Sequence, residues 1–188
     1  MFAKTLLRFG GIILTFALLV GSTCNQPAPQ PRPGSAFEGS AHWARDLAQP
    51  HFASFASDAQ LHTVIGVQVY RDGRLPANAG SWGLVAWSPS QQKELQVNVR
   101  HTGTTTTTTR AQTNAPGAND QPIPANWVNS TTVFNATAPH RDASATLATL
   151  VSFNIATYDG PHWGINFNAG AEPNHYVNYD GTYLGTTP

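Results

Sequence analysis

The sequence predicts an all-β fold: a single antiparallel β-sandwich, with a closed β-barrel as the alternative, and a short N-terminal helix. Apolar and polar residues alternate along several segments, most clearly where Leu95, Val97 and Val99 are separated by polar residues. Asp-Gly pairs, which favour tight turns, occur at residues 72–73, 159–160 and 180–181. No long helical pattern lies between these segments, so we expect neighbouring strands to pair as hairpins.

The first 23 residues have the organisation of a signal peptide. Lys4 and Arg8 accompany an apolar start, and residues 9–20 carry no charge. This run is about half of the roughly 20 residues that a membrane-spanning helix needs. The pattern therefore favours an export signal over a permanent membrane span.

Residues 1–24 resemble a bacterial lipoprotein signal, in which the cysteine is lipidated and becomes the mature N-terminus. The resemblance implies a lipid on Cys24 that anchors the protein to a membrane of the cell envelope. Cys24 is the only cysteine, so no disulfide can form within one chain. Gly21 and Thr23 depart from the usual residues of such signals. Ordinary cleavage after Ser22, which would give a secreted soluble protein, stays open as the alternative.

Residues 24–40 are rich in proline and small polar residues, and we interpret them as a tether. An extended polyproline-like chain rises about 3.1 Å per residue, which would hold a domain away from a membrane surface. The rest of the chain, residues 41–188, is long enough for one β domain and its core.

Ser40 is a suitable N-cap for a helix over residues 41–49, with Pro50 closing it. Three strands are expected between His62 and His101. The threonine run at residues 104–109 gives no register, so we expect a ragged edge or an exposed loop there.

In the second half of the chain, residues 127–137 are predicted to be extended. A long strand is expected from Leu147 to the Asp-Gly pair at 159–160, and it pairs with a strand around Trp163. A last hairpin is expected across the pair at 180–181.

The charge balance excludes nucleic acid as a partner. Removing the signal takes away Lys4 and Arg8 and leaves eight basic against ten acidic residues. No basic surface of the kind that binds phosphates is therefore expected.

Histidines and acidic residues do not predict a metal site, a cofactor or a catalytic centre. Seven histidines occur, some near acids in His140-Arg-Asp142 and Glu172-x-x-His175. If His175 pairs opposite Asn168, it lies roughly 20 Å from His162, too far to share one zinc ion. No Gly-x-Ser-x-Gly motif occurs, and turn geometry accounts for the Asp-Gly aspartates.

Aromatic residues supply the candidate ligand-binding site. Aromatic rings stack on the C–H faces of sugars while nearby amides bind the hydroxyls, a combination typical of glycan-binding modules. The opposing interpretation is that the same rings pack in the core. The candidates are Trp82, Trp87, Trp127, Trp163, Tyr176 and Tyr179.

These observations predict an exported, lipid-anchored surface or periplasmic binding protein, with a carbohydrate or another envelope component as its ligand. Two alternatives stay open: a secreted hydrolase whose site the sequence does not reveal, and a structural component of the envelope. An exposed row of aromatics would favour binding, a deep cleft with converging acids and histidines would favour catalysis, and a long free sheet edge would favour assembly.

Overall fold

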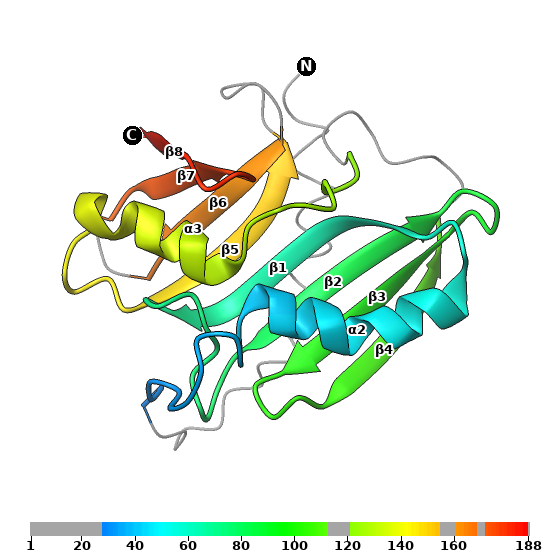
Figure 1. The fold of residues 1–188 in the computed structure, drawn as a ribbon, viewed down its shortest axis with the longest axis horizontal. Coiled ribbons are helices and arrows are strands. Elements are labelled where there is room, and N and C mark those ends of the chain that lie inside the picture. The colour runs from blue at the N-terminus through cyan, green and yellow to red at the C-terminus, as the bar shows by residue number, and fades with distance from the viewer. Residues whose placement is uncertain (1–27, 113–120, 155–160, 169–171, 188) are drawn as a thin grey trace.

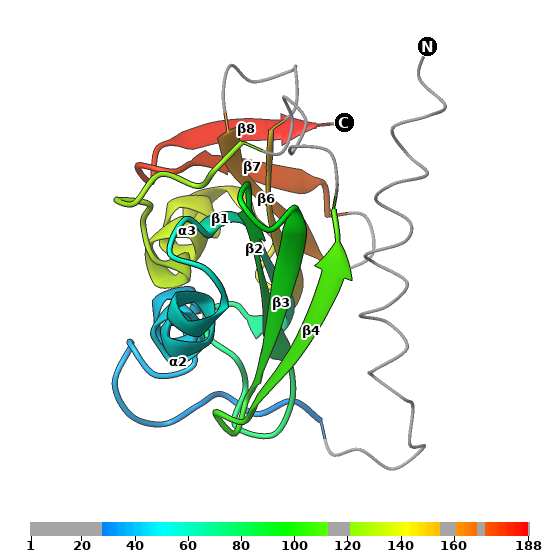
Figure 2. The ribbon, with the colours of Figure 1, turned by 90° about the vertical axis from the view of Figure 1, so that its right-hand side faces the viewer.

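The described part of the chain folds as one open antiparallel β-sheet of eight strands with helices packed on one face (Figure 1). The computed structural model describes residues 28–112, 121–154, 161–168 and 172–187. The strands are β1 (Gln60–Tyr70), β2 (Ser81–Ser88), β3 (Lys93–Arg100), β4 (Thr105–Ala111), β5 (Leu147–Asn154), β6 (Pro161–Phe167), β7 (Asn174–Asn178) and β8 (Tyr183–Thr187). The predicted antiparallel β fold with a helix at its N-terminal end is confirmed, and helices supply its second layer (Figure 2).

The two halves of the domain share one topology. Helix α2 (Ala41–Phe55) precedes the meander β1–β4, and helix α3 (Ser130–Thr137) with a short 3₁₀ turn, η1 (Ala138–His140), precedes the meander β5–β8. The strand order is β4-β3-β2-β1-β5-β6-β7-β8, so β1 and β5 join the two halves at the centre of the sheet. Both helices lie on the same face (Figure 2).

Helix α2 is longer than predicted. It begins after Ser40, whose side chain accepts from the Trp43 N–H, but it runs through Pro50 to Phe55. A proline inside a helix removes one backbone hydrogen bond. The extra turn nevertheless forms, because it buries Phe52 on the same side as Ala48.

Helix α3 corrects the prediction that residues 127–137 are extended. Asn129 caps the helix, and the buried residues recur at helical spacing: Ser130, Val133, Phe134 and Thr137. Threonine and valine favour strands in isolation, and packing on the sheet overrides that preference here.

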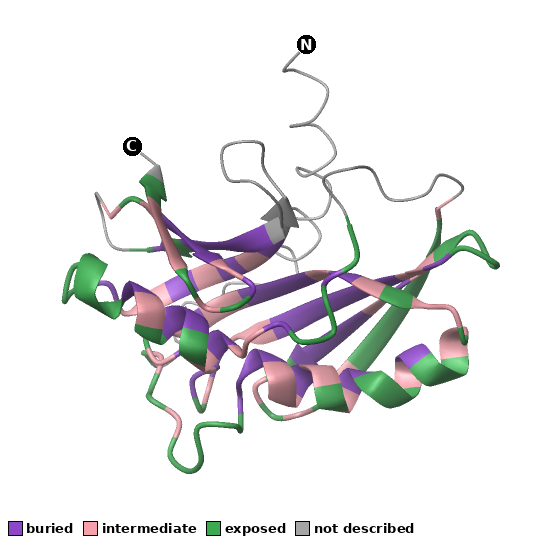
Figure 3. Cartoon of the chain, turned by 45° about the horizontal axis from the view of Figure 1, so that its top comes forward, coloured by how far each residue is buried: buried purple, intermediate pink, exposed green. Residues whose placement is uncertain are grey.

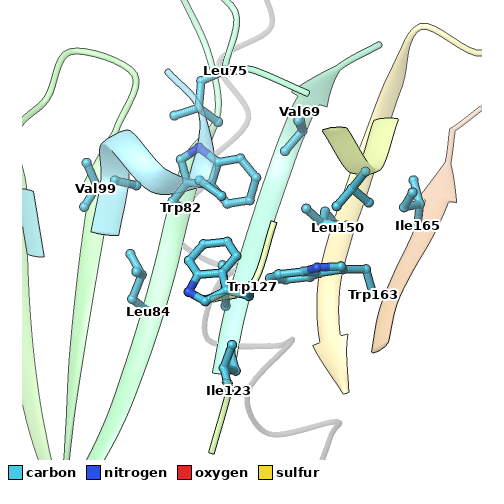
Figure 4. Close-up of a cluster of buried hydrophobic side chains, with 14 of the residues drawn as sticks. Val69, Leu75, Trp82, Leu84, Val99, Ile123, Trp127, Leu150, Trp163 and Ile165 are labelled. Atoms are coloured by element: carbon cyan, nitrogen blue, oxygen red, sulfur yellow. The ribbon is translucent and has the colours of Figure 1, made fainter. Parts of the chain in front are cut away.

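The core lies between the helices and the sheet (Figure 3). Trp127 packs against Trp163 with ring centroids 5.2 Å apart (Figure 4). The Trp163 ring also contacts Tyr179, with centroids 5.0 Å apart. Trp82 fills the other half of this layer, and its indole N–H donates to the Gly39 carbonyl at 2.9 Å. Large aromatic rings therefore span both halves of the sheet.

Residues 28–40, the described part of the predicted tether, lie against the domain. Arg32 donates to the carbonyls of Leu75, Pro76 and His101, and pairs with Glu38 at 2.8 Å. Its side chain is only 9% exposed. This arginine fixes the segment to the loop between β1 and β2 and to the turn after β3.

The threonine run forms β4, a regular edge strand, which corrects the expectation of a ragged edge or an exposed loop. Seven consecutive pairs join it to β3, from Lys93–Ala111 to Val99–Thr105, with no bulge. The predicted first-half strands are confirmed as β1, β2 and β3. In the second half, β5 pairs with β6 and β7 pairs with β8, as predicted. The predicted extension of β5 past Asn154 lies outside the described residues.

Candidate functional site

The face of the sheet opposite the helices carries the polar side chains of β3. On β3, Leu95, Val97 and Val99 belong to the core beneath the helices. The alternate residues Glu94, Gln96 and Asn98 therefore point to the other face. We call this second surface the open face.

A polar pocket lies on the open face of β1–β4. Cross-strand register builds its floor, because Thr63, Val85, Gln96 and Thr108 pair in sequence across all four strands. Glu94 and Arg110 pair in the neighbouring row. The complete lining is His62, Thr63, Val85, Glu94, Gln96, Thr108 and Arg110.

A β-bulge brings His62 to this pocket. Leu61 pairs with Ala86 and Thr63 pairs with Val85, so His62 is the extra residue between two consecutive partners on β2. Bulges redirect side chains in this way. The redirected imidazole lines the pocket beside its neighbour Thr63.

His62 and Glu94 lie close together in the pocket. The imidazole Nε2 lies 3.6 Å from Glu94 Oε1, and Nδ1 lies 3.1 Å from the Thr63 hydroxyl. The His62 side chain is 7% exposed and the Glu94 side chain is 21% exposed. A Thr63 O–H that donates to Nδ1 places the imidazole proton on Nε2, toward the carboxylate.

Asn98 continues the polar row beyond Gln96. It is 7% exposed, and its Oδ1 has no hydrogen-bond partner among the described residues. A buried amide oxygen without a partner is costly and calls for a donor.

The structure places most of the predicted aromatic residues in the interior. Trp82 and Trp163 are fully buried, and Trp127, Tyr176 and Tyr179 are at most 6% exposed. Burial also raises the pKa of Tyr179, whose hydroxyl bonds to Ser152. These five rings offer no exposed stacking surface.

Trp87 is the one predicted aromatic residue that is only partly buried. It lies on the open face, pairs with Glu94 across β2 and β3, and donates its indole N–H to the Gln112 carbonyl at 3.2 Å. Trp87 therefore stands next to the pocket.

A second cluster joins the two histidine-containing motifs of the sequence. His175 Nε2 lies 2.7 Å from Glu172 Oε1, and His175 Nδ1 lies 3.0 Å from the Tyr183 hydroxyl. The Asp142 N–H donates to the other Glu172 oxygen at 3.0 Å. The His140 ring stacks on Tyr183 with centroids 4.0 Å apart. The cluster has the carboxylate–imidazole–hydroxyl arrangement that activates a hydroxyl in many enzymes.

Arg141 borders this second cluster. Its guanidinium lies over the Phe167 ring at 5.2 Å and donates to the Arg71 carbonyl at 2.8 Å. Burial and the charge of Arg71 lower the pKa of Arg141, and Glu172 partly opposes that shift. The cluster thus ties the turn after α3 to β1 and to β6–β8.

The register of β6 and β7 differs from the one predicted. His175 pairs with Ile165, not with Asn168, and His162 pairs with Asn178. Residues 162 and 165 are an odd number apart, so His162 and His175 point to opposite faces. Among the described residues, no group of three or more His, Cys, Asp or Glu side chains is arranged to hold a metal ion.

Most of the pocket residues could not be identified from the sequence. Glu94 and Gln96 stand on the polar side of the clearest alternating segment, which is a signal for an exposed face. Arg110, Thr108 and His62 reach the same place only through the β3–β4 register and the bulge in β1.

No protein-family model matches the chain, and no curated protein or solved structure is significantly similar to it. Within the part of the chain that the structure describes, no helix has the length and apolar character required to span a membrane. Cys24 lies outside the described residues.

Proposed function

We propose that this protein is an exported, lipid-anchored binding protein that binds a small polar ligand, a glycan unit, on the open face over this pocket. The observation that carries the proposal is the convergence of Glu94, Arg110 and Gln96 beside the partly exposed Trp87.

The chemistry of the pocket fits a ligand rich in hydroxyl groups. Carboxylate and amide oxygens accept from sugar hydroxyls, while guanidinium and amide N–H groups donate to them. Trp87 offers part of an aromatic face for the C–H surface of a sugar ring. Glu94 and Arg110 carry opposite charges, so the pocket favours a neutral or zwitterionic ligand.

Rigid positioning also supports binding. The pocket residues stand on four paired strands, and side chains on strands are held more precisely than side chains on loops. Of the six aromatic residues predicted to bind the ligand, the proposed site includes only Trp87. The other residues of the proposed site are polar residues of β1, β3 and β4.

The attachment to a membrane rests on the signal segment and Cys24. The intact mass of the mature chain from a membrane fraction tests it, and a diacylglycerol on Cys24 is the expected result. A mature chain that begins after Ser22 and carries no lipid would overturn the anchor without affecting the pocket.

A glycan array followed by titration calorimetry tests the binding function. A bound sugar should lose at least tenfold in affinity for Glu94→Gln and for Thr108→Ala, because both side chains line the pocket. Thr106→Ala is the matched control, since Thr106 is another exposed threonine on the same side of β4 and lies outside the pocket. No binding to any sugar, or equal loss in Thr108→Ala and Thr106→Ala, would refute the proposal.

A hydrolase is the second candidate, favoured by the Glu172–His175–Tyr183 cluster. Glu172 orients the imidazole, and His175 Nδ1 is placed to take the proton of the Tyr183 hydroxyl. A screen with chromogenic esters and glycosides tests this candidate. Activity that Tyr183→Phe removes while the fold is retained would support catalysis.

A further inference from the structure

Among the residues that the structure describes, nothing pairs with the outer edge of strand β4, so this edge presents open hydrogen-bonding groups. This strand is the last on its side of the sheet, and residues 106–111 are exposed (Figure 3). The Arg100 N–H donates to the Thr104 carbonyl and the Gln112 N–H donates to the Gln92 carbonyl. In an antiparallel ladder the bonded pairs recur every second residue. The even-numbered residues of β4 therefore bond to β3, and residues 105, 107, 109 and 111 direct their N–H and C=O groups outward.

This edge has few of the features that usually prevent strand addition. Proteins protect edges with charged side chains, proline, bulges or short strands. Arg110 is the one charged residue of β4. β4 is seven residues long, contains neither proline nor lysine, and has unbroken register with β3. The opposite edge, β8, has five residues, a register shift against β7, and Gly185 at a positive φ of 131°. Only the β4 edge is therefore suited to pairing.

We propose that β4 pairs antiparallel with β4 of a second copy of this chain, forming a two-fold symmetric dimer with one continuous sheet. Full overlap of the outward-facing residues sets the register. Thr108 faces Thr108 of the second copy across the two-fold axis. Thr107 pairs with Thr109, and Thr105 pairs with Ala111. In this register Arg110 faces Thr106, so the single charge of β4 never meets itself.

The threonine run favours a second copy over an unrelated peptide. Residues 105–109 are all threonine, so the strand offers no side-chain pattern that could select a foreign sequence. Threonine pairs well with threonine across antiparallel strands. In a two-fold symmetric pair the same strand meets itself, and full overlap of its outward-facing residues then sets the register that the side chains do not specify.

The dimer has a consequence for the proposed binding function. The axis is perpendicular to the sheet, so the open faces of both copies look the same way. Thr108 and Arg110 line the pocket, so the two pockets flank the seam and can bind one polyvalent ligand together. This step alone rests on the proposed function; the dimer itself does not.

Disulfide trapping of the full chain tests the register. Thr108 opposes its own copy at a non-hydrogen-bonded position, where Cα atoms lie about 4.5 Å apart, within disulfide range. Thr108→Cys should therefore cross-link under mild oxidation. Thr106→Cys is the control, because the two copies of residue 106 lie roughly 14 Å apart in this register. The parent chain, with Cys24 as its only cysteine, gives the background.

Sedimentation velocity of the same chain in detergent tests the edge itself. Thr107→Pro should abolish the dimer, because it removes an outward N–H that β3 does not use. Thr107→Ala keeps that N–H and should leave the dimer intact. A monomer in the parent chain, equal cross-linking of Thr106→Cys and Thr108→Cys, or a dimer that survives Thr107→Pro would each overturn the proposal.

Discussion

The Ser130 hydroxyl accepts a hydrogen bond from the Ala41 N–H at 2.9 Å, and so joins the first turn of α3 to the first turn of α2. The same hydroxyl donates to the Gly73 carbonyl at 2.6 Å. Asn129 reinforces the contact, since its Oδ1 accepts from the His42 N–H at 3.1 Å and its Nδ2 donates to Ser40 Oγ at 3.0 Å. Backbone N–H groups at the start of α2 are thus satisfied by side chains from the other half of the domain.

Ser130→Ala should lower the free energy of unfolding by about 2 kcal/mol, because it leaves a buried N–H and a buried C=O without partners. Urea denaturation measures the change. Thr132→Ala, on the exposed side of the same helix, should cost less than about 0.5 kcal/mol. Equal effects of the two variants would mean that the Ser130 contact does not couple the helices.

Arg32→Ala should release residues 28–40 from the domain. The variant loses the bonds to three backbone carbonyls and the contact of the guanidinium with the Trp43 ring at 5.8 Å. We expect a loss of about 2 kcal/mol and faster proteolysis within this segment. Arg45→Ala is the control, because its ion pair with Asp46 is exposed and is worth at most about 1 kcal/mol. Unchanged proteolysis in Arg32→Ala would show that other contacts hold the segment.

The alternation of apolar and polar residues was sufficient to predict most of the antiparallel strands. Leu95, Val97 and Val99 share the buried side of β3, and β6 shows the same period at Trp163, Ile165 and Phe167. The Asp-Gly turns at Gly73 and Gly181 both have a glycine with positive φ, and the one at Gly181 closes the β7–β8 hairpin. The turn at Gly73 follows β1 and leads into the longer loop before β2.

Features that depend on tertiary contacts could not be predicted. Residues 130–137 contain both a strand-like composition and a helical spacing of apolar residues, and only packing on the sheet selects the helix. The pocket depends on an inserted residue, His62, that no local pattern marks. Arg32 looks like part of a linker until the distant carbonyls that it binds are known.

His42 should make the fold sensitive to mild acid. Its Nε2 lies 3.0 Å from the Trp127 carbonyl, and burial, helped by the charge of Arg45, lowers its pKa below the ordinary value of 6.5. Above pH 6.5 the side chain is neutral in both folded and unfolded chains. As the pH falls below 6.5, the unfolded chain takes up a proton first, so stability is lost until the pH passes the folded pKa.

His42→Gln provides the comparison, because the amide can still donate to the Trp127 carbonyl but does not titrate. The free energy of unfolding, measured in urea at pH 7.5 and pH 5.5, should fall more in the wild type than in His42→Gln. An identical fall in both proteins would rule out His42 as a source of the acid sensitivity.

The second cluster yields a graded series of stability changes. His175→Ala leaves the Glu172 carboxylate, whose side chain is 6% exposed, without its imidazole partner, and should cost about 3 kcal/mol or more. Tyr183→Phe removes one hydroxyl but keeps the ring stacked on His140, so a loss of about 1 kcal/mol is expected. His140→Ala, at an exposed position, should cost less than about 1 kcal/mol. Thermal and urea denaturation measure all three. If His175→Ala lowers the free energy of unfolding no more than His140→Ala does, the cluster does not stabilise the contact between the turn after α3 and strands β7 and β8. The buried carboxylate–imidazole pair would then be better explained by catalysis than by folding.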